Sequence, residues 1–448
     1  MDLHEPAPCL KRLLEGCQAA GLPAIVTFRP YWEAGQYPGP EAPRLAALRT
    51  AADLGAEYIN VEYLAAESFF ASHGKVPPST QVILSHHNYE ETPGDEVLEA
   101  LVEGMFQSGA DVAKLATMPQ RIEHSARMLA LPGKFAGRPV IALAMGEKGL
   151  ASRILAPKFG GFLTFGALSA SRSSAPGQPT VTELRRVYRL QNQSAATQVF
   201  GIVGNPVGHS QSPALHNAAL AAAGMDAVYV PLLVDELRPF LEAFPAFAGL
   251  SVTLPHKVLL FCEELAALEC AGESNGGAAR IGAANTLVRQ SGGGLKAYNT
   301  DASAVEAGLG GSKQGAEYPL KGLRVVVVGA GGAGRALAFG ALGRGASVSV
   351  CNRTREKADA LAEALGSGAE AAELADVAAG KVAGDVLMNS TSIGMHPAEW
   401  GTPVSAHALS AYKLVFDAVY TPLQTRLLRA AEQFELFTGK PAPVELMR

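Results

Sequence analysis

A chain of 448 residues is too long for one hydrophobic core and predicts two or three domains. With 18% charged and 48% hydrophobic residues, the composition is globular and excludes a largely disordered chain. The net charge of −5 gives no reason to expect nucleic acid or a membrane surface as a partner. No apolar run approaches the roughly 20 residues that span a bilayer.

The cysteines predict neither a zinc site nor a disulfide framework, because none of the five forms a C-x-x-C pair. They suit a reducing compartment, and no metal site is predicted. The start, MDLHEPAPCLKRLLEGCQAAG, lacks a long apolar segment, and its early acidic residues argue against a transit peptide. We expect either a protein that acts where it is made or a chain whose true start lies upstream.

Residues 22–167 contain six apolar runs of strand length: LPAIVTFR, EYINVEY, QVILSHH, DVAKLAT, PVIALAM and GFLTFGA. Helix-like segments lie between most of them, and this alternation predicts a parallel sheet, closed or open. Six strands are too few for a closed barrel of eight. Polar residues at the strand ends nevertheless favour an incomplete barrel, whose strand ends meet at one mouth. They are His87, Lys114, Arg29 and Arg153.

The polar stretch SASRSSAPGQPT (169–180) and the helix-like segment VTELRRVYRLQNQ complete the first half. A second α/β unit begins at QVFGIVGNP (198–206). After the linker GGSKQGAEYPLKG, the chain continues as a strand, loop, helix and strand. We therefore expect domains over residues 1–195, 198–312 and 318–418, with a helix and tail over 419–448 that packs on the second domain.

Lys114 lies inside the apolar run of GADVAKLATMP, where desolvation favours the neutral amine. A neutral amine attacks carbonyl groups, and His87 could then remove a proton from the carbon next to the iminium. A lysine in a strand more often snorkels or pairs with a carboxylate. SHHN could equally be a metal-ligand pair or an ordinary strand end, so the residue types leave these alternatives open.

The segments SHHNYEETP, GADVAKLATMPQ and SAPGQ resemble type I 3-dehydroquinate dehydratase, a (β/α)8 barrel with a Schiff-base lysine. The resemblance covers about residues 20–190. It implies that Lys114 forms the imine, that His87 is the general acid and base, and that Glu33 orients His87. It also implies four substrate contacts, with the arginines suited to a carboxylate: Arg29, Arg153, Ser174 and Gln178.

The implied reaction is imine formation, proton abstraction and loss of water, which converts 3-dehydroquinate to 3-dehydroshikimate. One departure from the family lies at the start of this half. Residue 22 already enters the family's third strand, so the two preceding strands and their substrate-binding Glu-x-Arg pair have no counterpart here.

A glycine-rich loop follows the strand LRVVVV and begins a helix. Its G-x-G-x-x-G spacing, in this context, predicts a pyrophosphate at the helix N-terminus, the alternative being a tight turn without a ligand. The loop residues are Gly329, Ala330, Gly331, Gly332, Ala333 and Gly334. The next strand ends in cations rather than an acidic residue, which favours NADP over NAD, or else marks a solvated basic turn. This segment contains Asn352, Arg353, Thr354, Arg355 and Lys357.

Four loops supply hydroxyls, an amide, a lysine and an aspartate: GNPVGHSQSP (204–213), SVTLPHK (251–257), IGAANT (281–286) and YNTD (298–301). This set suits a small polyhydroxylated substrate, and a Lys/Asp pair can relay the proton that accompanies a hydride. Each loop alone could be turn chemistry.

Together these segments resemble shikimate dehydrogenase over about residues 198–448. The resemblance implies that Lys257 and Asp301 form the catalytic pair and that residues 352–354 bind the NADP phosphate. It implies substrate contacts by Ser210, Ser212, Thr253, Asn285 and Tyr420. Thr253 implies a preference for shikimate over quinate. A segment with a further substrate-binding glutamine, expected between TRLL and QFELFTG, is absent.

The order of the two halves resembles the plant-type bifunctional enzymes of the shikimate pathway. This implies dehydration of 3-dehydroquinate, then NADPH-dependent reduction of 3-dehydroshikimate to shikimate, in a soluble protein of the chloroplast. The implied partners are these small molecules and neither nucleic acid nor a membrane, with the oligomeric state open. Two alternatives remain: a quinate dehydrogenase, or a partly or wholly inactive relative that only binds NADP or a metabolite.

Overall fold

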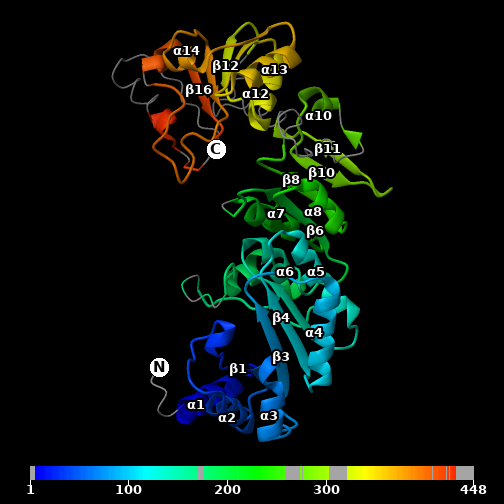
Figure 1. Cartoon of the computed structure of the whole chain (residues 1–448). Coiled ribbons are helices and arrows are strands. Elements are labelled where there is room, and N and C mark those ends of the chain that lie inside the picture. The colour runs from blue at the N-terminus through cyan, green and yellow to red at the C-terminus, as the bar shows by residue number, and fades with distance from the viewer. Residues whose placement is uncertain are drawn as a thin grey trace. The chain divides into compact units, whose positions relative to one another are not determined.

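The computed structural model describes residues 6–169, 171, 173, 175–208, 210–257, 273–274, 276–301, 320–405, 407–419, 421–422 and 424–429. The chain divides into two compact units (Figure 1). The first comprises Met1–Asp235 and Pro239–Phe247, and the second comprises Glu236–Arg238 and Ala248–Arg448. The predicted contacts of Ser174 and Tyr420 lie outside the described residues.

The first unit begins with a parallel sheet in the order β1-β2-β3-β4-β5. Its strands are β1 (Ile25–Thr27), β2 (Tyr58–Glu62), β3 (Gln81–Asn88), β4 (Val112–Thr117) and β5 (Val140–Ala144). The helices between or before them are α1 (Pro6–Ala19), α2 (Glu41–Asp53), α3 (Ala66–His73), α4 (Asp95–Gln107) and α5 (Glu123–Lys134). Short helical turns are η1 (Tyr31–Glu33), η2 (Tyr63–Ala65) and η3 (Glu147–Gly149), and α6 (Leu150–Ile154) follows β5. The predicted alternation of strand and helix is confirmed.

The prediction of a sixth strand at GFLTFGA is wrong for the described residues. Phe162 N–H donates to Val140 O at 2.9 Å, but no ladder continues from this bond, and Ala167 forms only an isolated bridge with Thr180. Leu163 and Phe165 instead pack their side chains against one face of the sheet. This apolar run is therefore core packing rather than a strand.

The helix-like segment VTELRRVYRLQNQ is also not one helix. It forms η5 (Glu183–Val187) and η6 (Leu190–Asn192), which are separated by Arg189 in the left-handed region at φ 47°. A positive φ at a residue with a side chain interrupts a right-handed helix.

The two faces of the first sheet differ in chemistry. One face packs the side chains of residues such as Ile59, Leu84 and Leu115 into a core with the helices. The other face carries a small apolar cluster that includes Ile83 and Ile141, and polar and charged side chains lie next to this cluster. Strand register sets Glu62 beside Ser85, and Ser85 beside Lys114, in one row across β2, β3 and β4. The polar row lies toward the carboxyl ends of the strands.

The first unit also contains β6 (Gln198–Gly204), which pairs in parallel with β7 (Ala227–Leu233), and the helix α7 (Ser212–Ala222). α8 (Leu237–Ala243) follows. In the second unit β8 (Phe247–Val252), β10 (Thr286–Arg289) and β11 (Leu295–Tyr298) are antiparallel neighbours, and β9 (Glu273–Ser274) runs parallel to β11. α10 (Gly276–Ile281) precedes β10.

Residues 324–417 of the second unit form a parallel sheet in the order β14-β13-β12-β15-β16. Its strands are β12 (Arg324–Val328), β13 (Ser347–Cys351), β14 (Ala369–Ala371), β15 (Val386–Asn389) and β16 (Leu414–Asp417). Its helices are α12 (Gly332–Gly343), α13 (Arg355–Leu365), α14 (Leu374–Ala378) and the turn η7 (His407–Ala411). The strand order reverses at β12, which is where doubly wound sheets bind their ligands. None of the helices that the structure describes could span a bilayer.

The side chain of Asn217 on α7 forms two hydrogen bonds with the backbone of β7. Its Nδ2 donates to Tyr229 O at 2.7 Å, and Tyr229 N–H donates to its Oδ1 at 2.9 Å, with the residue only 2% exposed. We expect Asn217→Ala to lower the free energy of unfolding by about 2–3 kcal/mol, because it leaves a buried carbonyl and a buried N–H unpaired. Urea unfolding of the variant checks this. Leu215→Ala, at a position 68% exposed on the same helix, is the control, and an equal loss there would contradict the assignment.

Candidate active sites

Lys114 is buried in β4, with 6% of the residue exposed. Its Nζ lies 4.5 Å from the centroid of the Phe165 ring. Burial, reinforced by the charge of Arg29, lowers the pKa of Lys114 to about 7 although Glu33 and Glu62 oppose the shift. The side chain therefore does not snorkel to solvent, and near neutral pH a large share of it is the nucleophilic free amine.

His87 and Glu33 form a buried pair. Nδ1 of His87 lies 2.7 Å from Oε2 of Glu33, and the two side chains are 3% and 4% exposed. Burial raises the pKa of Glu33 to about 7, with Glu62 adding to the shift, and burial lowers the pKa of His87 well below its ordinary value. When Nδ1–H of His87 donates to Glu33, Nε2 of the neutral ring is left as the base. His87 also lines a cavity of about 630 Å³.

The predicted substrate arginines occupy the same end of the sheet. Arg153 of α6 is 2% exposed, its buried Nε has no hydrogen-bond partner among the described residues, and burial lowers its pKa to about 10. An arginine without a local partner fits a site that receives an anion. Arg29 follows β1 and acts electrostatically on Lys114 and on Glu33.

Gln178 lies in a loop that packs on Gly146, whose N–H donates to Pro176 O at 3.0 Å. This loop begins near Ser173, whose hydroxyl lies 3.4 Å from Oε1 of Gln178. Gln178 and Ser210, predicted for two different substrates, line one cavity of about 580 Å³ in the first unit.

In the second unit Lys257 and Asp301 form an ion pair, with Nζ 2.8 Å from Oδ2 and side chains 18% and 30% exposed. Asn285 donates through Nδ2 to the other carboxylate oxygen of Asp301 at 2.7 Å. Thr300 N–H donates to Oδ1 of Asn285 at 2.9 Å. The segments SVTLPHK, IGAANT and YNTD thus meet, and three of the predicted residues lie in one network.

Of the other predicted substrate contacts, Thr253 is half-buried just beyond β8. Ser210 and Ser212 lie in the first unit at the start of α7, where Ser212 N–H donates to Oγ of Ser210 at 3.2 Å. Their convergence with Asn285 on one substrate remains a prediction, since the two groups belong to different units.

The glycine-rich turn has the shape that a dinucleotide requires. Gly329 has φ 110°, and a Cβ on Gly334 would lie 2.0 Å from Gly329 O, so the turn admits no side chain there. A Cβ on Gly331 would meet nothing within 4 Å, which leaves open space for a phosphate at the start of α12. A Cβ on Gly332 would lie 2.7 Å from Cβ of Lys257, so this helix packs directly on the Lys/Asp pair.

The predicted phosphate-binding segment is arranged only partly as expected. Asn352 accepts from Ala330 N–H at 3.3 Å, and its Nδ2 donates to Thr354 O at 3.0 Å, which ties the segment to the turn. Arg353 is exposed. Arg355, however, is held by Asp359 at 2.8 Å and Glu373 at 2.5 Å. Its charge is already paired, so Arg353 is the better candidate for a 2′-phosphate.

Sequence reasoning did not single out three buried polar residues at these sites. Glu62 and Arg44 form an ion pair whose side chains are both 0% exposed. Arg335 of α12 donates through Nε to Ile281 O at 2.6 Å and so connects the dinucleotide helix to the IGAANT segment. In the sequence, only Glu62 gave a hint of its buried position, because it is a charged residue at the end of the apolar run EYINVEY.

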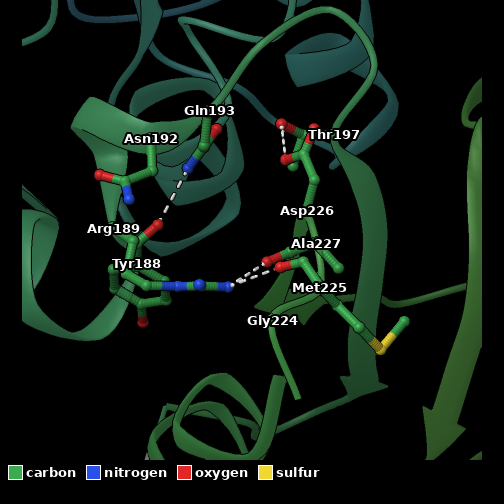
Figure 2. A pocket seen from close by; sticks show the side chains of 9 residues that line it. All are labelled: Tyr188, Arg189, Asn192, Gln193, Thr197, Gly224, Met225, Asp226 and Ala227. Atoms are coloured by element: carbon green, nitrogen blue, oxygen red, sulfur yellow. Dashed lines mark hydrogen bonds between the residues drawn. The ribbon is translucent and has the colours of Figure 1, made fainter. Parts of the chain in front are cut away.

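A separate cavity of about 240 Å³ is lined by residues of 188–197 and 224–227. Figure 2 shows these lining side chains. Arg189 points its guanidinium at Ala227 O, 2.7 Å away, and Gln193 donates to Tyr188 O at 3.1 Å. None of the predicted site residues that the structure describes lines this cavity. Its polar groups hold the junction between the first half and β7. Among the described residues, no group of His, Cys, Asp and Glu could hold a metal ion.

Comparison with known families matches both halves. Residues 2–195 match the family model for type I 3-dehydroquinase. Residues 202–287 match the shikimate dehydrogenase substrate binding domain, and residues 312–397 match shikimate/quinate 5-dehydrogenase. Residues 430–448 match the shikimate 5′-dehydrogenase C-terminal domain.

Among curated proteins, the chloroplastic bifunctional 3-dehydroquinate dehydratase/shikimate dehydrogenase of Arabidopsis thaliana is 47% identical over 458 residues. The match covers 95% of this chain and 74% of that protein. The shikimate dehydrogenase (NADP(+)) of Methanosarcina mazei is 39% identical over 56% of this chain and 96% of its own length. The solved shikimate 5-dehydrogenase of Thermus thermophilus, in complex with NADP(H) and shikimate, is 34% identical over 54% of this chain and 94% of that chain, with a TM-score of 0.44.

The chain is therefore an enzyme with two halves, a type I dehydroquinase (a lyase) and a shikimate dehydrogenase (an oxidoreductase). It belongs to the family of bifunctional 3-dehydroquinate dehydratase/shikimate dehydrogenases. The predicted family, α/β fold class and pair of activities are confirmed.

The buried lysine has a cost in stability that can be measured. Its pKa is about 7 in the folded protein against an ordinary value of 10.5, so between these values the unfolded chain binds more protons. Lys114 therefore opposes folding at pH 7 and below, and this penalty disappears as the pH rises toward 10.5. We expect Lys114→Met to raise the free energy of unfolding by about 2 kcal/mol or more at pH 6.5, with less gain at pH 10.

Denaturant unfolding at several pH values checks this expectation. Lys75→Met, at an exposed position, is the control and should give no comparable pH-dependent gain. A Lys114→Met variant that is no more stable than the parent at pH 6.5 would show that the amine is not desolvated.

Proposed function

We propose that the first unit dehydrates 3-dehydroquinate through an imine on Lys114, and that the Lys257–Asp301 site serves the NADPH-dependent reduction of 3-dehydroshikimate to shikimate. One observation carries the first assignment: an amine with a pKa of about 7 lies at the same end of the sheet as the buried His87–Glu33 pair. Such an amine is nucleophilic without a separate base.

The dehydration follows from these groups. Neutral Nζ of Lys114 adds to the substrate carbonyl, water leaves, and the iminium makes the neighbouring C–H acidic. Nε2 of His87 takes that proton, and it returns the proton to the departing hydroxyl, which leaves as water. Hydrolysis of the imine then frees the product and Lys114. Arg153, with its unpartnered buried Nε, is suited to the substrate carboxylate.

In the second unit the residues present fit a dinucleotide phosphate. The open space at Gly331 would accept the pyrophosphate at the start of α12, and exposed Arg353 would contact a 2′-phosphate. Bound NADPH supplies a hydride. Lys257 donates a proton to the substrate oxygen. Asp301, which accepts a hydrogen bond from Asn285, holds the Lys257 ammonium in position.

We also propose the location, the domain boundaries and the remaining substrate contacts. The Arabidopsis relative is named chloroplastic, and we propose the same compartment for this chain. The boundaries 1–195, 198–312 and 318–418 are supported by the family matches over 2–195, 202–287 and 312–397. Ser210, Ser212 and Thr253 are proposed as shikimate contacts on their resemblance alone.

Replacement of Lys114 tests the dehydratase. We expect Lys114→Ala to lower the dehydration rate roughly a thousandfold or more and to leave NADP-dependent oxidation of shikimate unchanged. In the parent protein, dehydration should increase with pH through about 7 as Lys114 loses its proton. Borohydride added with product should increase the mass of the parent at Lys114. Lys134→Ala, at an exposed position, is the control, and loss of both activities in Lys114→Ala would contradict separate sites.

Replacement of Asp301 tests the dehydrogenase. We expect Asp301→Asn to lower the shikimate oxidation rate about a hundredfold, because Lys257 loses its ion pair, while NADP⁺ affinity changes less than about threefold. Asp376→Asn on α14 is the matched control. In the parent, turnover of shikimate with NADP⁺ should exceed that of quinate with NAD⁺. The reverse order would identify a quinate dehydrogenase, and NADP⁺ binding without turnover would identify a binding protein.

A further inference from the structure

Glu62 is a buried carboxylate that the proposed dehydratase chemistry does not use. It is the last residue of β2, it is 0% exposed, and strand register aligns it with Ser85 and then Lys114 on the same face of the sheet. Two strand spacings, about 10 Å, separate the backbone positions of Glu62 and Lys114. Both side chains therefore lie in one layer at the carboxyl end of the sheet.

One carboxylate oxygen of Glu62 faces Arg44. Arg44 of α2 donates through Nη1 to Oε2 of Glu62 and to Phe28 O. Oε1 of Glu62 is buried and has no hydrogen-bond partner among the described residues. A buried ion pair satisfied on one side contributes little to stability, since desolvation offsets the attraction. Stability alone is therefore a weak reason for this carboxylate.

The charges around Glu62 come from every element at this end of the sheet. The cations are Arg29 after β1, Arg44 on α2, Lys114 on β4 and Arg153 on α6. Two other carboxylates face them: buried Glu33, which is paired with neutral His87, and half-exposed Glu41 on α2, which lies 2.7 Å from Arg44. Arg29 and Arg153 both lower the pKa of Lys114. Glu62 raises it. Glu62 therefore offsets part of the effect of these cations on Lys114.

We propose that Glu62 is an electrostatic positioning residue of the dehydratase, whose buried carboxylate stabilises positive charge on Nζ of Lys114 in the ammonium and in the iminium. This inference rests on the proposed imine chemistry of Lys114. Without Glu62, Glu33 would remain as the buried carboxylate that opposes the cations acting on Lys114, and the iminium would form at a greater electrostatic cost. Burial raises the pKa of Glu62, and the ion pair with Arg44 opposes that shift.

The test measures the titration of Lys114 in the full chain without relying on turnover. Cyanate carbamylates only the neutral amine, so the rate of mass increase at Lys114 between pH 5 and 10 reports its pKa. The variants are Glu62→Gln, which removes the charge, and Glu62→Asp, which retains it. Glu67→Gln, an exposed acidic position on α3, is the matched control.

We expect Glu62→Gln to lower the pKa of Lys114 by on the order of one unit, as a unit charge two strands away does at an effective dielectric constant of about 20. The carbamylation rate at pH 5 should then increase roughly tenfold. Borohydride trapping with 3-dehydroquinate should fall in the same variant, because less iminium accumulates. Glu62→Asp and Glu67→Gln should both titrate like the parent.

A purely structural ion pair would lower stability in Glu62→Gln without moving the titration toward lower pH, and that result overturns the inference. If Glu62→Gln does not fold, the double variant Glu62→Gln/Arg44→Gln removes both charges of the pair. It must still show a downward shift, smaller than that of the single variant because the cation is lost as well. A parent whose Lys114 titrates near 7 but is not trapped by borohydride would contradict the proposed imine chemistry instead. The two failures are therefore distinguishable.

Discussion

The desolvation of Lys114 is the constraint on which the first half of this molecule depends. A strand that buries an ammonium can be tolerated only if the surrounding layer supplies compensating charge or the amine gives up its proton. Both happen here. Glu33 and Glu62 oppose the lowering of the pKa of Lys114, and the lowered pKa leaves much of the amine neutral near pH 7. The buried ions at the carboxyl end of the sheet are thus one interdependent set.

The lysine of the second half, Lys257, has a different environment from Lys114. Lys257 is partly exposed and lies 2.8 Å from Asp301, so its ammonium has a direct counter-ion and contact with solvent. The helix that begins at the glycine-rich turn packs on the side chain of Lys257 through Gly332. The glycine-rich turn and the Lys257–Asp301 pair are therefore linked by a close backbone approach, because a side chain at position 332 would clash with Lys257. One lysine is suited to nucleophilic attack and the other to donating a proton.

Much of the fold could be predicted from the sequence. Alternating strands and helices have strong local periodicity, so the parallel sheets were anticipated. The wrong predictions fell where local patterns are ambiguous. GFLTFGA is as apolar as a strand, but its side chains fill the space over the sheet instead of extending it. VTELRRVYRLQNQ has helical composition, yet Arg189 adopts a left-handed conformation that a propensity argument does not foresee.

The sequence by itself determined which residues have unusual chemistry for their surroundings. Lys114 stands out in an apolar strand, and Lys257 and Asp301 stand out within motifs of definite spacing. Only the tertiary structure decided which charges act together, because strand register and helix packing bring Glu62 and Arg44 into the layer of Lys114 from distant positions. It also decided that Arg355 is paired with carboxylates and that Asn285 braces Asp301. Electrostatic effects depend on distance and burial, and neither quantity is encoded in the spacing of residues along the chain.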